Sequence, residues 1–134
     1  MKKLLSVSMI IMLSGCALVD AYMLSKYDNN EYKQITEIRA EAQLYKTQCA
    51  NVLLSSANAS KLAYDTRVFA LYAEHVPHNE NVQKAAVELD KIAQGINDQY
   101  QKSDKVSPVF CKIKFETVEK SADSMQKIIG AKPR

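Results

Sequence analysis

The chain has 134 residues, which is enough for one domain with a modest core and too few for two sizeable domains. It carries 18 Lys and Arg against 15 Asp and Glu, and two of the lysines lie at the extreme N-terminus, so the remainder is nearly balanced and gives no electrostatic basis for binding nucleic acid. Three glycines and three prolines are too few turn residues for a fold of many short strands, so we expect an all-helical protein.

The first sixteen residues are organised as a secretory signal. A positive start at residues 1–3 precedes an apolar run over residues 4–13 and two small residues. The next residue is a cysteine, and the segment Leu13-Ser14-Gly15-Cys16 resembles the lipobox of bacterial lipoproteins at all four positions. The resemblance implies cleavage between Gly15 and Cys16 and attachment of diacylglycerol to the Cys16 thiol.

The lipobox resemblance also predicts a location. Several acyl chains on Cys16 would hold the protein on a bilayer, because each buried methylene contributes about 0.8 kcal/mol. In this lipoprotein class an Asp directly after the lipidated cysteine retains the protein in the inner membrane, and this chain has Ala17 there. The expected location is therefore the outer membrane, lipid-anchored and facing the periplasm. The alternative is an uncleaved anchor, but the apolar stretch over residues 4–19 falls short of the about 20 residues that a spanning helix needs.

We divide the chain into a signal peptide (residues 1–15), a lipidated tether (16–29), a helical domain (30–130) and a short tail (131–134), which we expect to be frayed. Asp28 and Glu31 have the spacing of a capping box, so a helix is expected to begin there. Apolar or small residues then recur in alternating steps of three and four, as in a heptad-like seam on one helix face. The seam consists of Ile35, Ile38, Ala42 and Tyr45.

No glycine or proline interrupts this pattern before Pro77, so we expect one long helix from about residue 30 to 75. Two helices that are broken near Asn58 are the alternative. Asn79 is a suitable N-cap for the next helix, and Ser107-Pro108 has the pattern of a further helix start. Gly130 is placed to end that helix in the left-handed conformation. The expected fold is an elongated antiparallel bundle of three helices, or an up-down bundle of four if the first helix is broken.

The cysteine count bears on the same arrangement. If Cys16 carries lipid, Cys49 and Cys111 remain as an even pair in an oxidising compartment, and we expect a disulfide between them. A middle helix that folds back from Pro77 would bring the two cysteines to the same level in either bundle. Two separate buried thiols are the alternative.

No sequence motif predicts catalysis. A nucleophilic serine elbow, a phosphate-binding loop, a haem attachment site and a zinc cysteine cluster are all missing from the sequence. His75 and His78 lie near two glutamates, but Pro77 interrupts the helix that would have placed both imidazoles on one face. We therefore expect a protein that is not an enzyme and has no metal or other cofactor.

The seam of residues 35–45 is the sequence feature that points to a partner. In the three-helix arrangement it lies beyond the other helices and is exposed, and exposed apolar stripes usually contact something. A second copy or another envelope protein would then be the partner, and the function would be that of a non-catalytic interaction or structural module of the envelope. In the four-helix arrangement the seam is core. The alternative functions are an exclusion or lysis-related lipoprotein of a phage or plasmid and a weak metal or small-ligand binder.

Overall fold

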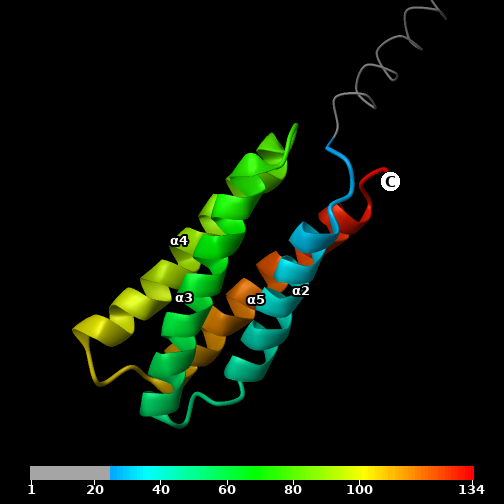
Figure 1. Ribbon diagram of the computed structural model, residues 1–134. Coiled ribbons are helices and arrows are strands. Elements are labelled where there is room, and N and C mark those ends of the chain that lie inside the picture. The colour runs from blue at the N-terminus through cyan, green and yellow to red at the C-terminus, as the bar shows by residue number, and fades with distance from the viewer. Residues whose placement is uncertain (1–24) are drawn as a thin grey trace, which may run out of the picture.

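The computed structural model describes residues 25–134, which form an antiparallel bundle of four helices (Figure 1). The helices are α2 (Asn29–Tyr45), α3 (Val52–His75), α4 (Glu80–Lys102) and α5 (Pro108–Gly130), and no strand occurs among these residues. In cross-section they form a square, in which α2 packs beside α3 and α5, and α4 packs beside α3 and α5. The all-helical bundle expected from the sequence is confirmed, in its four-helix form.

The expected single helix over residues 30–75 is wrong, because α2 ends at Tyr45 and α3 begins at Val52. Polar side chains cap the two helix ends on either side of this break. Thr47 Oγ1 donates to the Leu44 carbonyl at 2.6 Å, and the Asn51 side chain accepts a hydrogen bond from the Leu54 amide at 3.0 Å. These bonds compete with the helical pattern without any glycine or proline. Asn58, near which a break was the alternative, lies inside α3.

The other helix starts agree with the sequence signals. Asp28 Oδ1 accepts from the Glu31 amide at 2.8 Å, and Ser107 Oγ accepts from the Phe110 amide at 3.1 Å. Pro108 is the first residue of α5, where its missing N–H costs nothing. Asn79 precedes α4 as expected but makes no side-chain cap bond.

Gly130 does not end α5 in the left-handed conformation, since no glycine among the described residues has a positive φ. It is the last residue of α5, and a Cβ atom there would lie 3.1 Å from Cε2 of Tyr32. The glycine therefore allows the last turn of α5 to pack closely against the first turns of α2.

The core is one cluster of apolar side chains from all four helices, with Phe69 and Phe115 as its largest fully buried members. The seam of α2 belongs to this cluster. None of its side chains is more than 7% exposed, and its members are Ile35, Ile38, Ala42 and Tyr45. The expectation that this seam is an exposed interaction surface is therefore wrong. Ending the first helix at Tyr45 lets α3 fold back alongside α2, and α5 covers α2 as well.

A disulfide joins Cys49, in the connection between α2 and α3, to Cys111, in the first turn of α5. The two Cα atoms are 5.7 Å apart, and both cysteines are buried. This is the pair expected from the sequence. It fastens two chain segments at the end of the bundle opposite to the one where the described residues begin (Figure 1).

Candidate functional site

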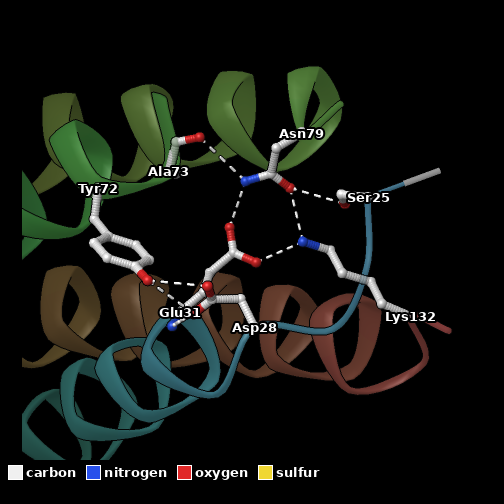
Figure 2. Close-up of polar contacts among 7 residues, drawn as sticks. All are labelled: Ser25, Asp28, Glu31, Tyr72, Ala73, Asn79 and Lys132. Atoms are coloured by element: carbon white, nitrogen blue, oxygen red, sulfur yellow. Dashed lines mark hydrogen bonds and ion pairs between the residues drawn. The ribbon is translucent and has the colours of Figure 1, made fainter. Parts of the chain in front are cut away.

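A buried polar cluster lies at the end of the bundle where the described residues begin (Figure 2). It connects the segment before α2, the first turn of α2, the corner between α3 and α4, and the tail after α5. We call it the polar junction, and its side chains are those of Ser25, Asp28, Glu31, Tyr72, Asn79 and Lys132.

Glu31 is at the centre of the polar junction. Its side chain is fully buried, and its Oε2 atom accepts from the Lys132 ammonium at 2.5 Å. Its Oε1 atom accepts from Asn79 Nδ2 at 2.5 Å. The Lys132 side chain is itself only 8% exposed. Burying a carboxylate costs free energy unless it is both paired and hydrogen-bonded, and Lys132 and Asn79 together offset this cost for Glu31.

Asn79 links the other segments to this pair. Its Nδ2 atom also donates to the Ala73 carbonyl at 3.1 Å, at the end of α3. Its Oδ1 atom accepts from Lys132 Nζ at 2.7 Å and from Ser25 Oγ at 3.2 Å. The amide group is therefore fully engaged in the polar junction, which explains why it does not cap α4.

Further contacts fasten the two chain segments that leave this end. The Tyr27 amide donates to the Pro133 carbonyl at 2.8 Å, and the Arg134 guanidinium lies 5.3 Å from the centre of the Tyr27 ring. The Tyr72 hydroxyl lies 3.0 Å from both carboxylate oxygens of Asp28. Residues 25–28 of the expected tether and the expected frayed tail are thus part of the folded structure, and the expectation of a frayed tail is wrong.

A hollow of about 180 Å³ opens between α2 and α3, and we call it the α2–α3 hollow. It is lined by Gln34, Glu37, Ile38, Glu41, Lys61, Tyr64, Asp65 and Val68. Lys61 forms ion pairs with Glu41 and with Asp65. Burial raises the pKa of the Glu41 carboxyl, and hydrogen bonds to Asp65 and Glu41 raise the pKa of Lys61.

An exposed apolar stripe on α3 borders this hollow. Tyr64, Val68 and Leu71 follow one another at the spacing of one helix face and are between 39% and 69% exposed. We call these three residues the α3 stripe. Two of them, Tyr64 and Val68, also line the hollow, so polar and apolar features meet at the same place on the surface.

The residues that the sequence singled out are placed differently. Cys16 lies outside the described residues. His75 ends α3 and His78 follows in the corner, and residues 25–134 contain no group of three or more His, Cys, Asp or Glu side chains that could hold a metal ion. Helices α2 to α5 include none that is long and apolar enough to cross a membrane.

Sequence reasoning missed the polar junction. The spacing of Asp28 and Glu31 signalled a cap, but Glu31 contacts Lys132 and Asn79 and not the backbone before its own helix. Asn79 lies 48 positions and Lys132 lies 101 positions after Glu31 in the chain, so no local sequence pattern marks these contacts. No family model, curated protein or solved structure matches this chain.

Proposed function

We propose that the protein is a lipid-anchored, non-catalytic interaction module of the bacterial cell envelope. Acyl chains on Cys16 would hold it on the periplasmic face of the outer membrane. The observation that carries this proposal is the lipobox resemblance of Leu13-Ser14-Gly15-Cys16. The polar junction supports it, because it fastens residues 25–28, the segment that leads back to Cys16, to α2, to the α3–α4 corner and to the tail. An anchor at Cys16 would thereby act on a rigid end of the bundle.

The chain length between anchor and bundle limits where the module can lie. Ser25 comes nine residues after Cys16, and a fully extended chain spans at most about 30 Å over that length. The helices of 23 or 24 residues are about 35 Å long. The polar junction would therefore lie within about 30 Å of the lipid anchor, which is less than the length of one helix.

The seam of α2 is buried and therefore does not serve as the contact surface in this proposal. The α3 stripe and the α2–α3 hollow take its place, since they present apolar and acidic side chains next to one another on the surface. A surface of this kind suits contact with another protein, in which an apolar patch is bordered by polar groups.

The test of the anchor is radiolabelled palmitate in cells that produce the protein. We expect label in the wild type and in a Cys49→Ser/Cys111→Ser variant, and none in Cys16→Ala. The mass of the mature wild-type protein should correspond to a chain that begins at Cys16 and carries lipid. Label in the alanine variant, or a mature mass that begins at Met1, would contradict the proposal.

A further inference from the structure

Helix α5 differs from the other three helices in the sign of its exposed charges. On each of α2, α3 and α4 the exposed charged side chains include both acidic and basic ones. On α5 every exposed charged side chain is a lysine, and these are Lys112, Lys114, Lys120 and Lys127. The outer face of α5 is therefore basic along the whole length of the helix.

The acidic side chains of α5 do not cancel this charge. They line the hollow beside α2, where each is half-buried and pairs with a basic side chain. The pairs are Glu116 with Lys120, Glu119 with Lys46, and Asp123 with Arg39. Lys112 and Lys114 form no ion pair among the described residues. Together with Arg39 and Lys46, α5 presents six basic groups against three acidic ones, which favours an anionic partner.

Exposed aliphatic side chains lie among these lysines. Val109 and Ile113 are 68% and 56% exposed, and Ile128 near the other end of α5 is 57% exposed. At 3.6 residues per turn, Val109, Ile113, Lys120 and Lys127 lie within about 40° of one another around the helix axis. Aliphatic and basic side chains thus share one face, which we call the α5 face.

This combination favours a bilayer over other anionic partners. An acidic protein surface would pair with the lysines but would leave the aliphatic side chains against polar groups. At a bilayer surface, aliphatic side chains enter the boundary between headgroups and acyl chains, while lysine stems extend to place their ammonium groups at the lipid phosphates. Anionic lipids add electrostatic attraction for each lysine near the surface.

The position of α5 in the bundle agrees with this partner. Helix α5 packs beside α2 and α4, and α3 also packs beside α2 and α4, so α3 lies diagonally opposite α5. With the α5 face on a bilayer, the α3 stripe would point away from it and stay free for a protein. The lipid anchor would keep α5 near the bilayer, so that a weak contact suffices.

We propose that the α5 face binds the surface of a bilayer that contains anionic phospholipids, so that the anchored bundle lies on its side. This inference rests on the proposed function, for which it specifies the orientation on the membrane. Ile113, in the second turn of α5, lies near the disulfide end, whereas Leu71 lies near the end of α3 beside the polar junction. A bundle that lies on α5 brings Ile113 to the bilayer and keeps Leu71 away from it.

The experiment uses the mature acylated protein, purified from cells and reconstituted into vesicles. The sequence has no tryptophan, so a single introduced tryptophan is the only one in the protein. Ile113→Trp is the reporter on α5, and Leu71→Trp on α3 is the matched control, because the two native side chains are 56% and 54% exposed. The vesicles contain brominated phosphatidylcholine with or without about one third of phosphatidylglycerol, an anionic lipid.

In the anionic vesicles the Ile113→Trp emission should shift to the blue and be quenched about twofold or more by the brominated chains, because the side chain enters the acyl boundary. The Leu71→Trp emission should be unaffected. The difference should nearly vanish in pure phosphatidylcholine and in about 1 M salt, where the Debye length is about 3 Å.

Charge variants connect the effect to the α5 face. In the Ile113→Trp protein, replacing Lys112 and Lys114 with glutamine should remove most of the quenching. Replacing Lys84 and Lys91 of α4 with glutamine is the matched control, because it changes the net charge equally and should leave quenching in place. All four lysines are exposed, and circular dichroism checks that each variant keeps its helices.

Several results would overturn the inference. Equal quenching of the two reporters, quenching of Leu71→Trp alone, or equal loss with both pairs of lysine variants would each exclude contact through the α5 face. Quenching that is as strong in pure phosphatidylcholine would exclude recognition of anionic lipid. No quenching in either lipid would favour an acidic protein surface instead. Palmitate label is measured on the same protein: a missing label overturns the proposed function, whereas labelled protein without selective quenching overturns this inference alone.

Discussion

The ammonium group of Lys132 lies 2.5 Å from the fully buried carboxylate of Glu31, 101 positions earlier in the chain. This ion pair ties the segment after α5 to the first turn of α2. Residues that follow the last helix are thus part of what stabilises the bundle, at the end from which the chain leads back to Cys16.

Replacing Lys132 with methionine should lower the free energy of unfolding by roughly 3–5 kcal/mol, because it leaves the Glu31 carboxylate buried without its cation. Thermal and urea unfolding measure the change. Lys127→Met is the matched control, since the Lys127 side chain is 76% exposed and its pair with Asp123 should contribute at most about 1 kcal/mol. Equal effects of the two variants would show that the buried pair has no special role.

Combining Lys132→Met with Glu31→Gln should recover part of the stability that Lys132→Met alone removes. The glutamine carries no charge, so burying it without a cation costs less than burying the carboxylate. A double-mutant cycle measures this coupling between the two residues. Simple additivity of the two single effects would mean that Glu31 and Lys132 act independently.

Ile38→Ala should lower the free energy of unfolding by about 2–5 kcal/mol, as is usual for truncating a fully buried aliphatic side chain. Ile38 is 1% exposed in the core between the helices. Leu53→Ala is the comparison, because Leu53 is 85% exposed and its truncation should change stability by no more than about 0.5 kcal/mol. An unchanged thermal midpoint for the Ile38 variant would contradict the burial of the α2 seam in the core.

Replacing both Cys49 and Cys111 with serine should lower the thermal midpoint. The disulfide joins residues that are 62 positions apart, and closing a loop of that length stabilises by about 4 kcal/mol in the chain-entropy description. Peptide mapping without reducing agent should recover the two cysteine peptides as one linked species, and Cys16→Ala should leave that species in place. Two free thiols in the folded, exported protein would contradict the pairing.

Glu41→Gln should raise stability at neutral pH and lose this advantage in acid. Burial raises the pKa of Glu41 in the folded protein, so the folded state favours the protonated form more than the unfolded chain does. Above the folded-state pKa the wild type carries a partly buried carboxylate that the folded state disfavours, and the neutral glutamine does not. Below the pKa of the unfolded chain both proteins are neutral at this position.

The measurement for Glu41 is a series of thermal midpoints from pH 7 down to about pH 3.5, just below the usual pKa of a glutamate. The midpoint difference between Glu41→Gln and the wild type should be positive at pH 7 and shrink as the pH falls through the folded-state pKa. Lys61 keeps Asp65 as a partner in the variant, so it is not left without a counter-charge. A midpoint difference that grows as the pH falls would contradict a raised pKa of Glu41 in the folded protein.

The amino-acid sequence by itself determined the features that depend on neighbouring residues. Helical periodicity, the caps at Asp28 and Ser107, Pro108 at the start of α5 and the pairing of the two remaining cysteines could all be predicted, because each depends on short-range geometry or on counting. The break between α2 and α3 was not predicted, because a continuous helix was expected there, with a break near Asn58 as the alternative. Asn51 and Asn58 are both polar, and only the packing of the helices decides which asparagine caps a helix and which lies inside one.

Tertiary structure alone decided which apolar face is core and which polar groups meet. Ile38 has the same sequence pattern whether α5 covers it or solvent does, so its burial follows from the position of the break and not from its own neighbours. Glu31, Asn79 and Lys132 have ordinary surroundings in the sequence and meet only because the antiparallel bundle returns both the α3–α4 corner and the tail to the start of α2. The α2–α3 hollow likewise arises where two helices pack without filling the space between them.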